Sequence, residues 1–271
     1  MNKKIVTIDV GNSRIKIGLF KNNDTSLLKN QLAIYIHSMA INIDESIPWE
    51  SLSKWSDARV DEIESVILGG VNPRGRDKVL DGWPATGWPA PVVIDNPFIL
   101  PIKINVGFPR TVGVDRLLNA IAGNVIRPDK FAMIIIDSGT ATTVDVISKD
   151  GTFEGGAILP GFQLCAIALH QYTALLPHIT NEEMANTTPK PLGKNTRDAL
   201  RSGLFWGQLG GVKELVKHYQ ETLGGNVVIV VTGGAGRLLV PQLPEDVIHE
   251  PFLALQGLVI VGQHLRQIKA K

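Results

Sequence analysis

Two stretches of the chain share one pattern of apolar and polar positions. Residues 133–148 read MIIIDSGTATTVDVIS, and residues 5–20 read IVTIDVGNSRIKIGLF. In each stretch four largely apolar residues lead into an aspartate, a glycine with small polar neighbours, and then a renewed alternation. This pattern predicts a buried strand, a tight glycine turn and a second strand that pairs back on the first. Because the unit occurs once in each half of the chain, we expect two related domains that face each other across a cleft.

Strand and helix patterns alternate through the rest of the chain. We expect further strands at 32–39, 65–73, 91–94, 151–161 and 227–231. We expect helices at 49–57, 74–83, 117–125, 162–176 and 196–223, and a last helix from 251 onward. This order predicts an α/β protein with a boundary just before the second hairpin. The expected domains are residues 1–128 and 129–271.

Composition narrows the class of protein. The 271 residues are 44% hydrophobic, enough for two domain cores, and carry a net charge of +1. This balance argues against a general binder of nucleic acid or membrane surfaces, which would show a clustered basic excess. Cys165 is the single cysteine, so the reducing cytoplasm is the expected compartment. We find neither a signal-peptide pattern nor an apolar run of about 18 residues, the length of a membrane span.

The aspartates of the two hairpins are the first candidate functional residues. Asp9 and Asp137 each follow an apolar run and precede small residues with backbone N–H groups and hydroxyls, which suits a metal-bound phosphate. The strand at 65–73 ends in a Gly-rich turn, a usual place for a ligand-facing loop. The P-loop motif is absent, and residues 233–236 lack the spacing of a dinucleotide fingerprint. We therefore expect a phosphate site built from aspartate hairpins and glycine turns.

Six motifs along the chain, in this order, resemble those of the type III pantothenate kinases. They are Asp9-x-Gly11-Asn12-Ser13 with Lys16, Gly113-x-Asp115-Arg116, Asp137-x-Gly139-Thr140-Ala141, Gly155-Gly156-x-Ile158-x-Pro160-Gly161, Asn195-Thr196 and Thr232-Gly233-Gly234. The resemblance covers nearly the whole chain. It implies two ribonuclease-H-like domains of the actin-like ATPase, acetate and sugar kinase superfamily, with ATP between them. It also implies a homodimer whose pantothenate pocket lies near the subunit interface.

The first hairpin is the expected nucleotide site. By resemblance the site comprises Asp9, Val10, Gly11, Asn12, Ser13, Arg14, Ile15 and Lys16. Asp9 is the candidate Mg²⁺ ligand, because Mg²⁺ keeps much of its water and takes few carboxylates. An aspartate that only caps its own turn is the alternative. The N–H groups of Gly11, Asn12 and Ser13 would surround a phosphate, and Lys16 would add a positive charge unless it is an ordinary surface lysine.

The second hairpin supplies two further expected ligands. Thr140 corresponds to the threonine that contacts ATP in these kinases. Asp137 corresponds to the aspartate that they use for a monovalent cation, K⁺ or ammonium. A structural hydrogen bond between Asp137 and Thr142 or Thr143 is the alternative.

The expected substrate site follows from the motif that begins at Gly113. It comprises Gly113, Val114, Asp115, Arg116 and Thr196. Asp115 is the candidate general base, which would orient the primary hydroxyl of pantothenate and accept its proton late in transfer. The guanidinium of Arg116 suits the polar groups of pantothenate. The alternatives are an N-cap by Asp115 beside a surface arginine, and a plain N-cap by Thr196.

One departure from the family bears on the substrate. Val106 stands where these kinases commonly carry an aromatic residue near pantothenate, and Thr111 stands where an acidic residue is frequent. Phe108 is close enough to substitute if its loop is rerouted. The implied function is ATP-dependent phosphorylation of pantothenate to 4′-phosphopantothenate, the first step of coenzyme A synthesis. The alternatives are a non-catalytic transcriptional accessory protein on the same scaffold and a kinase for another small hydroxyl substrate.

Overall fold

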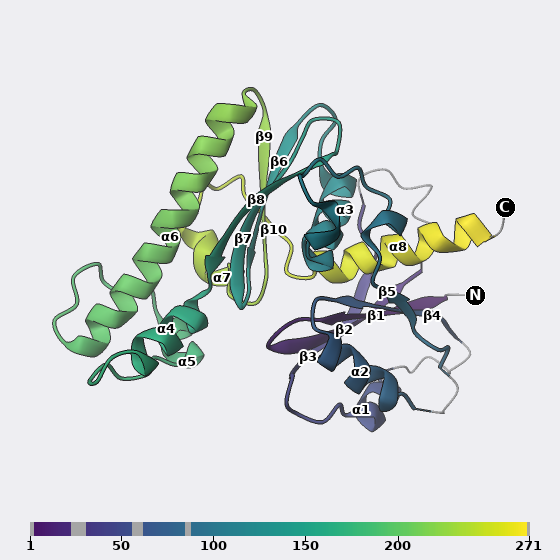
Figure 1. Cartoon of the computed structure of the whole chain (residues 1–271), viewed down its shortest axis with the longest axis horizontal. Coiled ribbons are helices and arrows are strands. Elements are labelled where there is room, and N and C mark those ends of the chain that lie inside the picture. Colours follow the sequence, from purple (N-terminus) through teal and green to yellow (C-terminus); the bar gives the residue numbers. More distant parts are fainter. Residues whose placement is uncertain (1–2, 23–30, 56–61, 85–87, 270–271) are drawn as a thin grey trace. The chain divides into compact units, whose positions relative to one another are not determined.

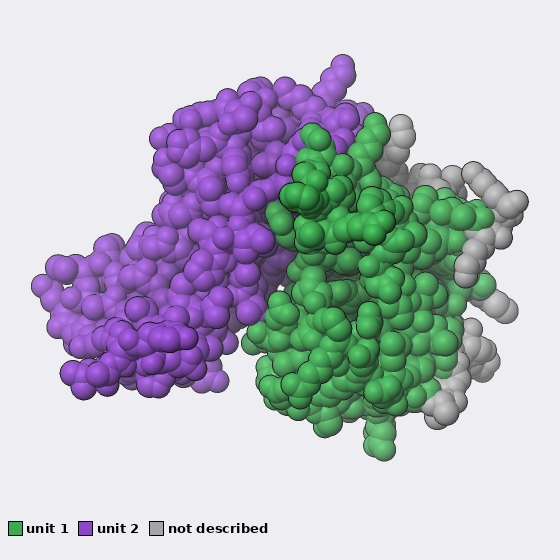
Figure 2. All heavy atoms as spheres, viewed as in Figure 1, with its two compact units in different colours: residues 1–128, 252–271 green, residues 129–251 purple. Residues whose placement is uncertain are grey.

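A computed structural model of the chain describes residues 3–22, 31–55, 62–84 and 88–269. The chain divides into two compact units, one of residues 1–128 with 252–271 and the other of residues 129–251 (Figure 2). Residues 252–271 therefore belong with the first unit, and not with the second domain as we expected. The last residues of the helix expected at 49–57 lie outside the described residues.

The first unit contains a five-stranded sheet with the order β3-β2-β1-β4-β5 (Figure 1). The strands are β1 (Lys4–Val10), β2 (Arg14–Lys21), β3 (Tyr35–Asn42), β4 (Ile63–Gly70) and β5 (Val92–Ile94). The predicted hairpin is β1 and β2, which pair antiparallel, whereas β4 runs parallel to β1. The third strand begins at Tyr35 and not at 32 as we predicted.

Four α-helices lie in the described residues of the first unit. They are α1 (Trp49–Ser53), α2 (Pro73–Asp81), α3 (Val114–Ile126) and α8 (Leu253–Lys269), with short 3₁₀ turns η3 (Pro97–Ile99) and η4 (Pro109–Thr111). The prediction that α3 begins at 117 was wrong, and Asp115 and Arg116 lie in its first turn. A Cβ on Gly257 would lie 2.2 Å from the carbonyl oxygen of Leu118. This close approach of α8 to α3 explains why the end of the chain belongs to the first unit.

Gln256 of α8 fixes the segment that precedes β3. Its Oε1 accepts from the N–H of Ala33 at 3.0 Å and its Nε2 donates to the carbonyl of Ala33 at 2.9 Å. Gln256 is 3% exposed, so loss of its amide would leave two backbone groups of Ala33 buried without these partners. We expect Gln256→Leu to lower the free energy of unfolding by about 2–4 kcal/mol, measured by urea denaturation. Gln267→Leu, on the exposed part of the same helix, is the matched control and should change it little.

The sheet of the second unit repeats the arrangement of the first. Its order is β10-β9-β6-β7-β8 (Figure 1). The strands are β6 (Ala132–Ser138), β7 (Ala141–Ile147), β8 (Phe153–Pro160), β9 (Val227–Thr232) and β10 (Ile248–His249). Again three successive strands pair antiparallel, and the fourth lies parallel on the other side of the first. The duplicated fold predicted from the two hairpins is thus confirmed, whereas the short β10 was not predicted.

The helices of the second unit follow the prediction in part. They are α4 (Phe162–Gln171), α5 (Asn181–Asn186), α6 (Thr196–Leu223) and α7 (Gly236–Leu239), followed by the 3₁₀ turn η5 (Val240–Gln242). Helix α4 ends five residues before the predicted 176, and α5 was not predicted. Helix α6 is continuous through Gly207, Gly210 and Gly211, and its apolar residues join the core over β6 and β7. In the part of the chain that the structure describes, no helix is long and apolar enough to span a membrane.

Candidate functional site

Asp9 and Lys16 form a pair across the first hairpin. They lie opposite each other in the β1–β2 register, and Lys16 Nζ is 3.7 Å from Asp9 Oδ2. Asp9 is 5% exposed, and a buried carboxylate needs a compensating partner such as this ammonium group. Lys16 is therefore directed at the aspartate and is not the ordinary surface lysine of the alternative.

In the turn of the first hairpin, the backbone N–H of Gly11 does not have the role that we predicted. The N–H of Gly11 donates to the carbonyl of Arg14 at 2.9 Å, because this bond closes the tight turn. That N–H is therefore already bonded within the turn, and Asn12 and Ser13 lie at the exposed tip. On either side of the turn, Val10 and Ile15 are buried in the core and Arg14 is exposed.

The Gly-rich end of β4 joins this hairpin to the loop before α3. Gly70 has a φ of +138°, and the next N–H, of Val71, donates to the carbonyl of Val10 at 3.0 Å. A Cβ on Gly113 would lie 3.3 Å from Cγ1 of Val71. The first hairpin, the end of β4 and the start of α3 are thus neighbours within the first unit.

Asp115 lies in the first turn of α3. The N-cap is Gly113, so the alternative that Asp115 caps the helix is wrong. Asp115 Oδ1 accepts from the N–H of Arg116 at 2.8 Å, and a Cβ on Gly113 would lie only 2.5 Å from this oxygen. Glycine at 113 therefore leaves room for the carboxylate, which stands at the positive end of the helix dipole. Val114 is buried beneath it, and Arg116 is half-buried.

Asp137 of β6 lies where two glycine turns meet. It is paired with Thr232 of the parallel strand β9, so the carboxyl ends of both strands share this edge of the sheet. A Cβ on Gly233, whose φ is +86°, would lie 2.3 Å from Asp137 Oδ1, and one on Gly139 would lie 3.7 Å away. The two turns can lie this close to the carboxylate of Asp137 because Gly139 and Gly233 have no side chains.

Thr140 is exposed in the turn between β6 and β7. Its carbonyl accepts from the N–H of Gly161 at 3.0 Å, which places the turn against the start of α4. Of the two threonines considered as partners of Asp137, Thr143 donates its hydroxyl to Asp145 at 3.0 Å. Thr142 is buried with its Oγ1 3.5 Å from the hydroxyl of Ser138.

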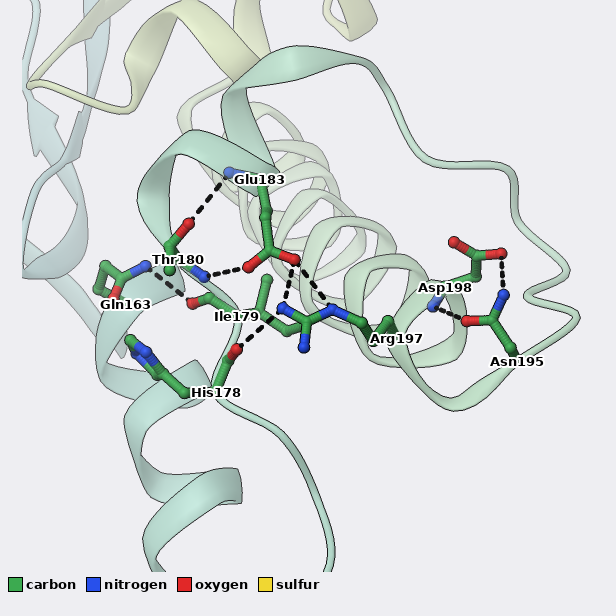
Figure 3. A network of polar contacts seen from close by, with 8 residues as sticks. All are labelled: Gln163, His178, Ile179, Thr180, Glu183, Asn195, Arg197 and Asp198. Carbon is green, nitrogen blue, oxygen red and sulfur yellow. Dashed lines mark hydrogen bonds and ion pairs between the residues drawn. The ribbon is translucent and has the colours of Figure 1, made fainter.

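Thr196 is the first residue of α6, and the N-cap is Asn195. Asn195 accepts from the N–H of Asp198 at 2.9 Å and donates to its carboxylate at 2.8 Å (Figure 3). The explanation of Thr196 as a plain N-cap is therefore wrong. Thr196 lines a cavity between α4 and α6.

A polar network that we did not predict holds this end of α6. Nε of Arg197 donates to Glu183 Oε1 at 3.0 Å, and Glu183 also accepts from the N–H of Thr180 at 3.0 Å (Figure 3). These hydrogen bonds lower the pKa of Glu183 below its usual value, and the bond from the N–H of Thr180 has the largest effect. Gln163 of α4 donates to the carbonyl of Ile179 at 3.2 Å. The signal was present in the sequence, since Thr180-x-x-Glu183 is a capping box.

Comparison with known proteins assigns the family. The family profile described as type III pantothenate kinase matches residues 5–218. The chain belongs to the type III pantothenate kinase family. A type III pantothenate kinase of Dehalococcoides mccartyi is 34% identical over 265 residues, which cover 97% of this chain and 98% of that protein. One of Persephonella marina is 30% identical over 257 residues, which cover 94% and 96%.

Solved structures show the same fold at low sequence identity. A protein described as a conserved putative Baf family transcriptional activator from Campylobacter jejuni superposes with a TM-score of 0.58 at 18% identity, covering 97% of this chain and 99% of that one. Component A of the (R)-2-hydroxyglutaryl-CoA dehydratase of Acidaminococcus fermentans gives a TM-score of 0.54 at 13% identity, with 99% and 100% covered. The family makes the chain a kinase that uses ATP as phosphoryl donor.

The donor groups of this type III pantothenate kinase fit the ions expected for it. Among the described residues no three His, Cys, Asp or Glu side chains cluster as a closed metal site. Asp9 stands as a single carboxylate, which suits Mg²⁺, an ion that keeps several waters and binds one or two carboxylates together with substrate phosphates. At Asp137 a Cβ on Gly233 would also lie 2.5 Å from the carbonyl oxygen of Ser138. The carboxylate and this carbonyl are oxygen donors of the kind that suit a monovalent cation.

The segment before Gly113 carries two exposed phenylalanines, Phe98 and Phe108. Phe108 is 79% exposed, and its carbonyl accepts from both the N–H and the hydroxyl of Thr111, at 3.1 and 2.8 Å. The guanidinium of Arg110 lies 5.6 Å from the ring centroid of Phe98. The ring of Phe108 is therefore not part of the core and can contact a ligand.

Proposed function

We propose that this kinase transfers the γ-phosphoryl group of ATP to the primary hydroxyl of pantothenate and that Asp115 is the general base. The product is 4′-phosphopantothenate, the first intermediate of coenzyme A synthesis. The family assignment supports the reaction. The observation that carries the role of Asp115 is its position in the first turn of α3, beside Gly113, whose lack of a Cβ leaves room for the carboxylate.

A carboxylate can act here without deprotonating the alcohol in advance. The pKa of a primary hydroxyl is far above that of Asp115, so the base orients the hydroxyl and accepts its proton as the new bond forms. Arg116 keeps its charge and binds the polar groups of pantothenate, and Gly113 and Val114 complete the wall on this side.

Each aspartate hairpin supplies groups that suit a nucleotide. In the first unit Asp9 would hold Mg²⁺, Lys16 would add a positive charge, and the turn of Asn12 and Ser13 would contact phosphate oxygens. In the second unit Thr140 contacts ATP. When bound, Mg²⁺ neutralises charge that develops on the phosphate oxygens. Phosphoryl transfer depends mainly on this positioning and charge neutralisation, so few side chains need to react.

A monovalent cation at Asp137 predicts a dependence of the rate on K⁺. We expect pantothenate-dependent ADP release with ATP, Mg²⁺ and K⁺, and a rate at least about tenfold lower when Na⁺ replaces K⁺, which corresponds to about 1.4 kcal/mol in the barrier. The measurement is a coupled ADP-release assay at constant ionic strength. Asp137→Asn should remove the difference between the two salts.

Two other results of this assay would each count against a part of the proposal. Equal rates in K⁺ and Na⁺ would remove the cation role of Asp137 and leave the reaction standing. No turnover in either salt, from folded protein, would remove pantothenate as substrate. Such a result would favour a kinase for another small hydroxyl substrate or the transcriptional accessory protein.

The same proposal includes a cytoplasmic homodimer. Among the described residues, the second unit exposes six large apolar residues of β8, α4 and the segment after α4, namely Ile158, Leu164, Ile167, Leu169, Tyr172 and Leu175. Tyr172 and Leu175 are 86% and 91% exposed. Large apolar side chains that are exposed to this extent are typical of a protein interface. Light scattering should give the mass of a dimer for the wild type and of a monomer for Leu175→Asp.

A further inference from the structure

The face of the second sheet that carries Asp137 also carries two polar residues of β7 that the proposed function does not use. Successive side chains of a strand point to opposite faces of its sheet. Ile136 and Val144 belong to the core that β6 and β7 share with α6, so Asp137, Thr143 and Asp145 lie on the other face. Thr143 is directly opposite Asp137 in the antiparallel register. The Cβ atoms of such a pair are about 4.5–5.5 Å apart, so one small ion can contact both side chains.

Asp145 determines where the hydroxyl hydrogen of Thr143 points. Thr143 Oγ1 donates to Asp145 Oδ2 at 3.0 Å. A hydroxyl has one hydrogen to donate and two lone pairs that accept. Because the hydrogen is directed along β7 to Asp145, the oxygen of Thr143 offers only lone pairs to its other neighbours. Beside Asp137, this oxygen is therefore suited to a cation.

Gly156 of β8 makes room for the carboxylate of Asp145. The two residues are opposite each other in the register of β7 and β8, and Asp145 is 1% exposed. A Cβ on Gly156 would lie 2.7 Å from Asp145 Oδ1 and 2.1 Å from the carbonyl oxygen of Val144. The second glycine of the Gly155-Gly156 motif thus has a structural reason. Burial of a carboxylate is unfavourable in itself, so stability alone would favour an apolar side chain at position 145.

We propose that Thr143 Oγ1 is a ligand of the monovalent cation at Asp137 and that Asp145 is the positioning residue that directs the hydroxyl hydrogen away from the ion. This inference rests on the cation role of Asp137 in the proposed function. Thr143 then adds an oxygen to those of the Asp137 carboxylate and the Ser138 carbonyl. Each protein oxygen that replaces a water favours K⁺ over Na⁺, because the larger ion holds its water less strongly. Thr143 is therefore a determinant of the preference for K⁺.

Cation binding can be measured without turnover, through the thermal stability of the full-length protein. We would add KCl or NaCl at constant ionic strength, balanced with choline chloride, in the presence of Mg²⁺ and a non-hydrolysable ATP analogue. A ligand that binds only the folded state raises the Tm with its concentration, so each series gives an apparent Kd for the ion. The wild type should bind K⁺ more tightly than Na⁺.

Substitutions at Thr143 test the ligand itself. Thr143→Val keeps the shape of the side chain and removes the oxygen, so it should raise the apparent Kd for K⁺ about tenfold. Thr143→Ser keeps the hydroxyl and should keep the wild-type Kd. Thr142→Val is the matched control, because Thr142 is the preceding residue of β7 and is buried on the opposite face. It should keep the preference for K⁺ even where the Tm itself changes.

Substitutions at Asp145 test the positioning role. In Asp145→Ala the hydroxyl of Thr143 loses its acceptor and can donate to Asp137 instead, which should raise the Kd for K⁺ as much as Thr143→Val does. Asp145→Asn keeps an acceptor oxygen and should keep most of the affinity. Wild-type affinity in Asp145→Ala would remove this role of Asp145.

The remaining outcomes separate this proposal from the proposed function. A wild-type Kd for K⁺ in Thr143→Val would overturn the ligand role of Thr143 and leave that of Asp137 standing. Equal affinities of the wild type for K⁺ and Na⁺ would remove both roles. The measurement contains no pantothenate, so neither outcome depends on whether pantothenate is the substrate.

Discussion

Replacement of Asp115 by asparagine is expected to lower kcat for pantothenate by about 10²–10⁴-fold, the usual contribution of a general base. Asparagine has nearly the same shape, so the first turn of α3 and its N-cap Gly113 should stay as they are. The amide cannot accept the proton of the substrate hydroxyl. Binding of nucleotide should change little, because Asp9 and Lys16, which we assign to the phosphates, belong to the β1–β2 hairpin. The measurement is steady-state ADP release together with the affinity for a fluorescent ATP analogue.

The control for Asp115 is an aspartate in the same unit without a proposed role. Asp95 follows β5 and is exposed, so Asp95→Asn removes the same charge elsewhere on the surface. It should leave kcat unchanged. Turnover in Asp115→Asn equal to that of the wild type would end the assignment of Asp115 as base, whereas a loss of nucleotide affinity would indicate a role in binding.

Local features of the sequence were enough to predict the two hairpins. In each hairpin a run of apolar residues leads into an aspartate, Asp9 or Asp137, and a glycine turn follows, so the two strands could be paired in one way. The observed registers place Lys16 opposite Asp9 and Thr143 opposite Asp137. The start of α3 could not be found in this way. Its N-cap is Gly113, which has no side chain to signal a helix end, and no side-chain hydrogen bond caps it.

Contacts between distant parts of the chain could not be predicted from pattern. The last helix was assigned to the second domain because it follows the second hairpin in the sequence. Its position depends on the close packing of Gly257 on Leu118 and on the hydrogen bond between Gln256 and Ala33. The residues of each pair are far apart in the sequence, so no local pattern predicts the contact. The candidate site shows the same limit. The spacing of the hairpin was enough to predict that Asp9 and Lys16 lie on the same hairpin. That Gly113, Val71 and Val10 are neighbours could be learned only from the structure.

Gly70→Ala is expected to lower the stability of the first unit by about 3–5 kcal/mol, a loss at the upper end for single substitutions. Gly70 has a φ of +138°, where a residue with a Cβ is strained by about 1–3 kcal/mol. The new Cβ would also lie 2.3 Å from the carbonyl oxygen and 2.6 Å from the nitrogen of Val10. Both are backbone atoms of β1, so rotation of a side chain cannot relieve the contact. The strand would have to move, and the bond from the N–H of Val71 to Val10 would weaken.

Tryptophan fluorescence in urea can measure this loss in the first unit. Trp49, Trp55, Trp83 and Trp88 pack against its core, whereas Trp206 is the one tryptophan of the second unit. Gly107→Ala is the control, because a Cβ there meets nothing within 4 Å, and its effect should stay within about 0.5 kcal/mol. Because β1 carries Asp9, Gly70→Ala should also lower the affinity for ATP under conditions in which it is folded. Equal urea midpoints for Gly70→Ala and Gly107→Ala would show that β1 and β4 can move apart at little cost in free energy. The packing of Gly70 on Val10 would then not be what holds the β1–β2 hairpin in place.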